Sequence, residues 1–167
     1  MKSKENLVFL GMMGSGKSSI GLIVSKKLNL DFIDVDLEVE KIEGMKISEI
    51  FDKKGEKYFR EIEEKTTLKV LKGKNNIISL GGGAFLNKNI QKEVLKNHIS
   101  FWLNWEPNTL INRIKDNKKR PIANNSSINE LTKLIKKRSL IYSKALYKIN
   151  CENFTKNEIA EIILKSL

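Results

Sequence analysis

Residues Gly11 to Ser18 have the types and the spacing of a loop that binds phosphate. They read G-M-M-G-S-G-K-S, which fits the pattern G-x-x-x-x-G-K-[ST]. Glycines let backbone N–H groups converge on phosphate oxygens, and the positive end of a following helix favours an anion there. Lys17 would reach the outer phosphates, and the Ser18 hydroxyl would reach Mg²⁺. The motif predicts a nucleoside triphosphate site and leaves open how the energy is used.

The residues on either side of this loop match the strand and the helix that the motif needs. The apolar run Leu7–Leu10 precedes it, and a helical pattern over 17–28 follows it. The alternative is an ordinary glycine turn that a Lys-Ser pair follows by coincidence. Such a turn would not require a strand before it and a helix after it. We therefore interpret the loop as the turn of a strand–loop–helix unit.

Two carboxylates follow the next strand pattern, where a metal ligand is needed. Phosphate-loop enzymes usually hold water on Mg²⁺ with an Asp at a strand end. The strand at 77–80 ends in glycines instead, so Asp34 and Asp36 are the candidates. Two positions apart on an extended segment, they would point the same way, one towards the metal and one towards an acceptor hydroxyl. The alternative is a pair of turn-forming or helix-capping residues.

The glycine run at 81–83 and the scarce arginines are further candidates. Three glycines let a small ligand approach backbone amides, although they also suit a tight turn. Of 31 basic residues only four are arginine, namely Arg60, Arg113, Arg120 and Arg138. Arginine offers a planar fork for carboxylate or phosphate that lysine cannot reproduce. We expect some of the four to bind anions rather than to be residual surface charges.

Apolar periodicity predicts the elements that must position these residues. Strands are expected at 7–10, 31–36, 77–80, 98–103 and 147–151. Helices are expected at 17–28, 37–42, 56–71 and 88–96, from Pro107, at 128–142 and from about 156, with a helical turn at 47–51 that Gly55 breaks. This alternation indicates an α/β three-layer sandwich around a five-stranded parallel sheet. Ligands bind such sheets at the carboxyl ends of the strands, where the candidate residues fall.

Composition limits the class of protein. The 167 residues, 40% of them hydrophobic, suit one globular domain over 1–167. The first strand begins within about six residues, and no apolar run approaches the roughly 20 residues of a membrane span, so we expect a cytoplasmic protein without a leader. Single Cys and His residues argue against disulfides or a zinc cluster. The net charge of +11 is spread along the chain, which indicates a solvated surface rather than a nucleic-acid patch.

The class of phosphate-loop protein can be narrowed further. Asp52-Lys53-Lys54-Gly55 imitates a GTPase switch but follows a helical pattern, and the chain is short for a motor ATPase. The polar stretch 116–127 carries Arg120 and is expected to be a mobile lid that closes on the transferring phosphate, with a solvated charge run as the alternative. A kinase of a small molecule or a nucleotide remains.

Taken together, these motifs resemble the shikimate kinase family. The likeness rests on G-M-M-G-S-G-K-S-S, F-I-D-V-D, F-R-E-I-E, L-G-G-G, K-R-P and K-K-R-S-L-I-Y, in the family's order from about Leu7 to Tyr147. The D-x-D, F-R-x-x-E and G-G-G motifs separate it from gluconate and nucleotide kinases. The resemblance implies a P-loop fold of the nucleoside-monophosphate-kinase type with a mobile lid. It also implies phosphate transfer from ATP to the 3-hydroxyl of shikimate, a step of aromatic amino acid biosynthesis.

The resemblance implies a role for each matching position. ATP would be bound by Gly14, Ser15, Gly16, Lys17, Ser18, Ser19, Arg113 and Arg120, with Arg113 on the adenine face and Arg120 reaching the phosphates from the lid. Shikimate would be bound by Asp36, Arg60, Gly82 through its backbone N–H, and Arg138, while Glu63 would orient Arg60. Mg²⁺ would be held by Ser18 directly and by Asp34 through water. The catalytic residues would be Lys17, Asp36 and Arg120.

Some positions depart from the family pattern, and other functions stay open. The family's Pro-Leu-Tyr reads Leu140-Ile141-Tyr142 here, and the stretch 151–154 does not match the family's adenine border, so no role is assigned there. A kinase of another hydroxy acid such as gluconate is one alternative. A non-enzymatic P-loop protein that binds nucleotide or nucleic acid is another. We expect a monomer whose partners are ATP and shikimate, with neither membrane nor nucleic acid.

Overall fold

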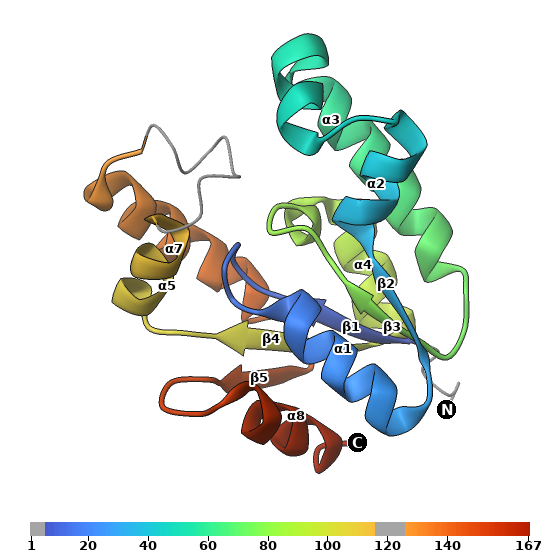
Figure 1. The fold of residues 1–167 in the computed structure, drawn as a ribbon, viewed down its shortest axis with the longest axis vertical. Coiled ribbons are helices and arrows are strands. Elements are labelled where there is room, and N and C mark those ends of the chain that lie inside the picture. Colours follow the sequence, from blue (N-terminus) through green and yellow to red (C-terminus); the bar gives the residue numbers. More distant parts are fainter. Residues whose placement is uncertain (1–5, 116–125) are drawn as a thin grey trace.

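In the computed structural model, which describes residues 6–115 and 126–167, a parallel sheet lies between two layers of helices (Figure 1). Its five strands are β1 (Leu7–Leu10), β2 (Asp31–Asp34), β3 (Asn76–Ser79), β4 (Ile99–Asn104) and β5 (Tyr147–Asn150), in the order β2-β3-β1-β4-β5. Every neighbouring pair is parallel. The predicted three-layer α/β sandwich of the nucleoside-monophosphate-kinase type is confirmed.

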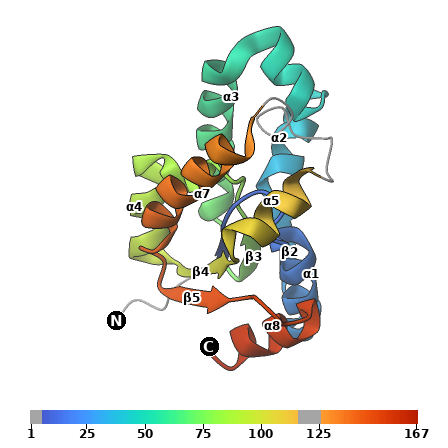
Figure 2. The ribbon, with the colours of Figure 1, turned by 90° about the vertical axis from the view of Figure 1, so that its left-hand side faces the viewer.

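Helices cover both faces of the sheet. On one face α1 (Lys17–Leu28) packs against α8 (Lys156–Leu164), and on the other lie α4 (Lys88–Asn97) and α7 (Ile128–Tyr142) (Figure 2). The remaining helices are α2 (Val35–Glu43), α3 (Ile47–Leu71), the short 3₁₀ helix η1 (Ala84–Leu86) and α5 (Pro107–Lys115). Because both faces are covered, the central strands are apolar on both sides; all four residues of β1 are buried.

Most predicted boundaries agree with the structure to within one or two residues, but the strand expected at 31–36 was too long. β2 ends at Asp34, and α2 begins at Val35. The Asp34 carboxylate accepts the backbone N–H of Asp36 at 3.0 Å, so it caps the helix and turns the chain out of the sheet. Asp36 therefore lies on the first turn of a helix, and the extended geometry expected for the pair is wrong.

Two local sequence signals are confirmed. Gly55 has φ 82° and ψ 167°, so it separates two helical segments within α3, as the sequence predicts. The segment Ser127-Ile128-Asn129-Glu130 has the sequence of a capping box, and the box forms at the start of α7, because Ser127 Oγ accepts the Glu130 N–H while Glu130 accepts the Ser127 N–H at 2.7 Å. These features fix the directions of α3 and α7, the helices that carry Arg60 and Arg138.

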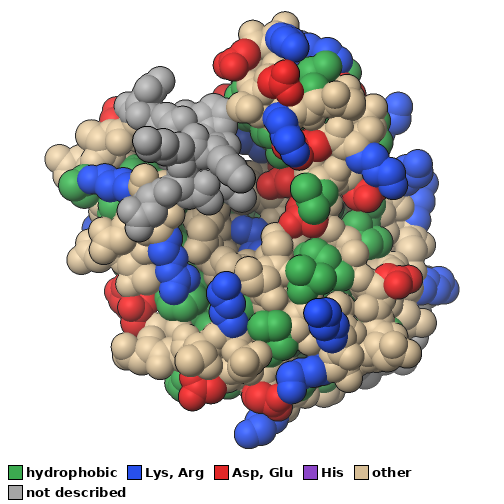
Figure 3. Space-filling model, in the orientation of Figure 1, with side chains coloured by type: hydrophobic (Ala, Val, Ile, Leu, Met, Phe, Trp, Pro, Cys, Tyr) green, Lys and Arg blue, Asp and Glu red, His purple; other side chains and the backbone are tan. Residues whose placement is uncertain are grey.

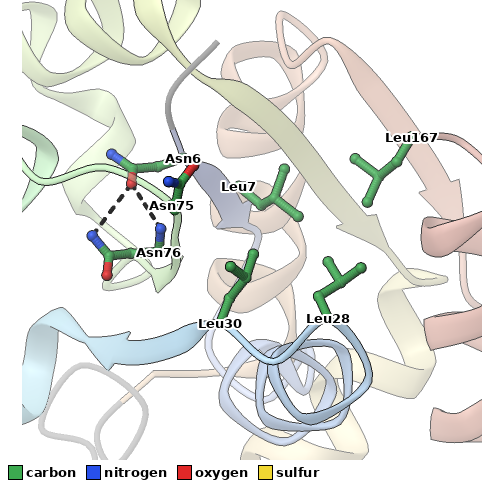
Figure 4. A pocket seen from close by; sticks show the side chains of 7 residues that line it. All are labelled: Asn6, Leu7, Leu28, Leu30, Asn75, Asn76 and Leu167. Carbon is green, nitrogen blue, oxygen red and sulfur yellow. Dashed lines mark hydrogen bonds between the residues drawn. The ribbon is translucent and has the colours of Figure 1, made fainter. Parts of the chain in front are cut away.

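Two hollows lie away from the carboxyl edge of the sheet. One, of about 170 Å³, opens at the opposite edge, where leucines and the amides of Asn6, Asn75 and Asn76 line it (Figure 4). The other, of about 450 Å³, lies beside the end of α2 and the start of α3. Neither contains a candidate site residue. Within the described ranges, no helix combines the length and the apolarity needed to cross a membrane.

Candidate active site

The predicted phosphate loop links β1 to α1. Gly14 (φ 77°) and Gly16 (φ 87°) adopt left-handed conformations that side-chain-bearing residues rarely take, so the loop can turn its backbone N–H groups inward. Lys17 is 7% exposed, and its Nζ donates to the carbonyls of Gly11 and Met12, both at 2.9 Å. The ammonium group therefore lies across the mouth of the loop, at the positive end of α1.

Ser18 and Asp34 meet beside this loop, although they lie on different elements. The Ser18 hydroxyl donates to Asp34 Oδ2 at 2.5 Å, while Asp34 Oδ1 caps α2. The pair therefore presents hydroxyl and carboxylate oxygens together, which are the ligands that Mg²⁺ prefers. Among the residues the structure describes, no cluster of three or more His, Cys, Asp or Glu side chains could hold a metal alone. A Mg²⁺ ion here would need phosphate and water oxygens as further ligands.

The glycines that follow β3 leave space for the charged side chains of three helices. None of the three has a positive φ, so backbone conformation does not require glycine there. A Cβ on Gly81 would lie 2.5 Å from Asp36 Oδ1 and 2.7 Å from Glu63 Oε1. A Cβ on Gly83 would lie 2.5 Å from Arg60 Nη1. Protein side chains therefore approach these glycines closely, whereas the approach of a small ligand to their backbone amides stays a prediction.

Arg60 projects from α3 with two carboxylate partners. Nη1 donates to Glu63 Oε2 at 2.7 Å, and Nη2 lies 3.3 Å from Glu56 Oε1. Burial lowers the pKa of Arg60, but the ion pairs with Glu63 and Glu56 outweigh it and leave the pKa raised, so the guanidinium stays charged. Its side chain is 31% exposed, and Glu63 holds it as predicted. Glu64, one turn further along α3, accepts hydrogen bonds from the side-chain amides of Asn87 and Asn89 instead of binding Arg60.

Glu63 is the most deeply placed carboxylate of the group, at 3% exposure. Burial raises its pKa above 4.5, Arg60 opposes this shift, and the negative charge of Asp36 adds to it. Two acidic and two basic side chains therefore share one partly desolvated region. The hollowed face in Figure 3 shows basic side chains at its base and acidic ones on the side nearer α2.

Arg138 reaches the same region from α7 and is 5% exposed. Its Nη1 donates to the Gly82 carbonyl at 3.4 Å and contacts Met12 Sδ at 3.8 Å, while its buried Nε has no hydrogen-bond partner among the described residues. One turn further along α7, the Tyr142 hydroxyl also donates to the Gly82 carbonyl. Burial raises the pKa of Tyr142 to about 12, so this hydroxyl remains a donor.

Arg113 lies at the other end of the phosphate loop. Its Cζ stands 3.6 Å from the centre of the Trp105 ring, and the Trp105 indole N–H donates to the Ser15 carbonyl at 2.9 Å. The turn after β5 is fastened to α5 here, because the Glu152 carboxylate accepts bonds from Glu106 N–H and the Thr109 hydroxyl. Sequence reasoning assigned no role to Trp105, Met12 or Glu152. For Trp105 the sequence offered one signal, namely an indole directly after a strand that ends beside the phosphate loop.

The structure therefore gathers the described members of the predicted site at one edge of the sheet. In or beside the phosphate loop lie Gly14, Ser15, Gly16, Lys17, Ser18, Ser19, Asp34 and Arg113, and in or around the glycine turn lie Asp36, Arg60, Gly82 and Arg138. Arg120 and nearly all of the predicted lid at about 116–127 lie outside the described residues.

A phosphate loop that faces a cluster of arginine and carboxylate side chains across one sheet edge is the arrangement expected of a P-loop kinase of a small acidic acceptor. The family model for shikimate kinase matches residues 13–167. A shikimate kinase of Thermodesulfovibrio yellowstonii is 41% identical over 162 residues, which cover 96% of this chain and 94% of that protein. The chain belongs to the shikimate kinase family, and it is an ATP-dependent kinase.

Solved structures agree with this assignment. A shikimate kinase of Acinetobacter baumannii in complex with shikimate has a TM-score of 0.93 at 27% identity and covers 99% of this chain and 93% of its own. One from Aquifex aeolicus has a TM-score of 0.87 at 35% identity, with 96% and 95% covered. A deoxyadenosine kinase of M. mycoides, at 18% identity and a TM-score of 0.64, shares the fold alone.

A methyl group on Gly81 tests whether the space above this turn is functional. In Gly81→Ala the new Cβ would collide with the ends of the Asp36 and Glu63 side chains, which can rotate away at small cost in stability. Misplacing a reacting group by about 1 Å can cost on the order of a hundredfold in rate, so we expect near-native melting and at least a tenfold loss of kcat/KM. The control is Gly73→Ala, whose Cβ would lie 2.8 Å from the Asn76 side-chain amide and 3.3 Å from the Val70 carbonyl, away from the candidate site. Native activity in Gly81→Ala would contradict this reading.

The raised pKa of Glu63 predicts the sign of a stability change with pH. The folded state holds the Glu63 proton to higher pH than the unfolded state, so the contribution of Glu63 is fully present below pH 4.5 and declines as the pH rises through the raised pKa. As the pH rises from 4.5 through the raised pKa, the unfolding free energy of wild type should therefore fall relative to that of Glu63→Gln.

Urea titrations at several pH values measure this difference. The control is Glu161→Gln, because a hydrogen bond from Lys27 lowers the pKa of Glu161. The unfolding free energy of wild type relative to that of Glu161→Gln should therefore rise with pH. If the unfolding free energy of wild type instead rose with pH relative to that of Glu63→Gln, burial would not be the dominant influence on the pKa of Glu63.

Proposed function

We propose that this chain transfers the γ-phosphate of ATP to the 3-hydroxyl of shikimate and forms shikimate 3-phosphate. Membership of the shikimate kinase family supports this activity over a gluconate kinase or a nucleic-acid-binding protein. One observation in the structure carries it furthest. The Asp36 carboxylate and the guanidinium groups of Arg60 and Arg138 converge on the glycine turn beside the phosphate loop. This arrangement suits an acceptor that has both a hydroxyl and a carboxylate.

The donor half would bind the triphosphate of ATP. Backbone N–H groups over 14–19 and the positive end of α1 would hold phosphate oxygens. Lys17 now bonds the carbonyls of Gly11 and Met12, and the same ammonium would turn to the outer phosphates. The Gly11 and Met12 carbonyls are neutral, so exchanging these two hydrogen bonds for bonds to anionic phosphate oxygens is favourable. Ser15 and Ser19 belong to the same cradle.

Mg²⁺ fits the oxygen pair that lies beside this cradle. Ser18 would be a direct ligand, and Asp34 would hold the ion through water. The ion usually keeps several waters and takes few protein ligands, which agrees with two oxygen-bearing residues and no larger cluster among the described residues. When bound, it would neutralise charge on the phosphate oxygens.

In the acceptor half, Asp36 would align the shikimate 3-hydroxyl for in-line attack and take up its proton. Phosphoryl transfer passes through a loose transition state, so alignment matters more than the strength of the base. Arg60 and Arg138 would bind the shikimate carboxylate, and the Gly82 N–H would meet the substrate directly. Glu63 keeps the Arg60 fork in place, since it accepts from Nη1 at 2.7 Å.

Two arginines complete the proposal on the nucleotide side. Arg113 would lie on the adenine face, and Arg120 would reach the phosphates of ATP from a lid at about 116–127. Closure of such a lid would exclude water and so limit wasteful hydrolysis of ATP. We further propose that 1–167 is a single P-loop kinase domain into which this lid is inserted.

Removing either catalytic charge should nearly abolish the reaction. We expect Lys17→Ala and Asp36→Asn to lose almost all shikimate-dependent ADP release while they keep the native melting temperature, because both act on the reacting groups. A coupled assay of ADP release measures this. The exposed Lys26→Ala and Asp52→Asn are matched controls that should stay active. Full activity in Lys17→Ala or Asp36→Asn would refute the proposed site.

Arg60→Lys tests recognition of the carboxylate. Losing one charge-assisted fork costs about 1.5–3 kcal/mol, so the KM for shikimate should rise at least tenfold. The KM for ATP should stay within about twofold, because Arg60 lies on the acceptor side. An unchanged shikimate KM would remove Arg60 from the binding site.

A further inference from the structure

The Trp105 indole lies between the phosphate loop and Arg113, and none of the proposed steps uses it. Trp105 follows β4 directly and is 7% exposed. Its indole N–H donates to the Ser15 carbonyl at 2.9 Å, so one edge of the ring is fixed to the backbone of the loop. A buried indole N–H with its bond satisfied holds the ring in one orientation.

The guanidinium of Arg113 stacks on this fixed ring. Its Cζ is 3.6 Å from the ring centroid, well inside the distance of about 6 Å at which a cation is attracted to an aromatic face. Among the ion pairs of residues 6–115 and 126–167, none involves Arg113. Within those ranges, its contact with Trp105 is therefore what orients the plane of the guanidinium.

The position of α5 brings this stacked pair close to any nucleotide in the loop. A Cβ on Gly14 would lie 3.5 Å from Arg113 Cβ, so the helix packs directly on the phosphate loop. Arg113 is an exposed residue that Trp105 covers on one face of its guanidinium. A planar cation held on one face by an aromatic ring can stack a second flat π system on the other.

We propose that Trp105 is a positioning residue: it holds the Arg113 guanidinium as a platform on which the planar base of the nucleotide stacks. This inference rests on the proposed function, because it needs a nucleotide in the phosphate loop. It assigns Trp105 to binding of the base and leaves the phosphates to the loop itself. The two contributions are separable, because a ligand without a base tests the loop alone.

The test compares two ligands by calorimetry in the presence of Mg²⁺, namely ADP, which has a base, and inorganic tripolyphosphate, which has none. In Trp105→Leu the affinity for ADP should fall about fivefold more than the affinity for tripolyphosphate. Trp105→Phe keeps an aromatic face, so the ratio of the two affinities should stay within about twofold of wild type. In an Arg113→Ala background, Trp105→Leu should not change this ratio further.

The matched control is Lys148→Ala, which removes a cation from the face of the other tryptophan, 5.1 Å above Trp102. It should leave both affinities unchanged. If Trp105→Leu weakened the binding of both ligands equally, Trp105 would serve only the loop. That result would overturn the proposal, and so would a variant that binds both ligands as wild type does. If wild type bound neither ligand, the proposed function itself would fail. If wild type bound both ligands and Trp105→Leu left the ratio of their affinities unchanged, only this inference would fail.

A second measurement does not depend on the folding of Trp105→Leu. The difference in fluorescence between wild type and Trp105→Phe isolates the emission of Trp105. ADP should change this emission, whereas tripolyphosphate should not, and Arg113→Ala should abolish the response to ADP. A response of equal size to both ligands would contradict stacking through Arg113.

Discussion

The candidate site depends on three residues that have no side chains. After β3 the chain crosses a region that Asp36, Glu63 and Arg60 already occupy, and a single Cβ on Gly81 or Gly83 would lie within 2.7 Å of their polar atoms. Because none of the three glycines has a positive φ, the constraint is one of space. The Gly82 carbonyl then accepts bonds from Arg138 and Tyr142 of α7. One turn therefore brings α2, α3 and α7 together.

Charge balance explains why these side chains can share a buried region. Glu63, at 3% exposure, would be costly as an isolated carboxylate, and burial does raise its pKa, but Arg60 at 2.7 Å offsets much of that cost. Arg138 lies against neutral acceptors, the Gly82 carbonyl and the Met12 thioether, and its Nε has no hydrogen-bond partner within the described part of the chain. Met12 belongs to the phosphate loop, so this contact also joins the two halves of the site.

Local patterns predicted the elements well, because the signals that define them span only a few residues. The loop at 11–18, the break at Gly55 and the cap at Ser127 are of this kind. The predicted end of the strand at 31–36 was wrong, because the side chain of Asp34 caps a helix that begins at Val35. The alternation of apolar and polar residues does not show that a side chain will end a strand in this way. Contacts between distant positions, such as Met12 with Arg138 or Trp105 with Ser15, leave no local pattern. The family resemblance named residues that the structure places near one another, but the packing that orients them required the structure.

The central claim is that the turn at 81–83 and the phosphate loop together form a two-substrate site for shikimate and ATP. The most direct test incubates the protein with MgATP and an equimolar mixture of shikimate and gluconate and identifies the products by nuclear magnetic resonance. We expect that shikimate alone is consumed, that its 3-hydroxyl carries the phosphate, and that ADP forms in equal amount. Phosphorylation of gluconate, of another shikimate hydroxyl, or of neither compound would contradict it.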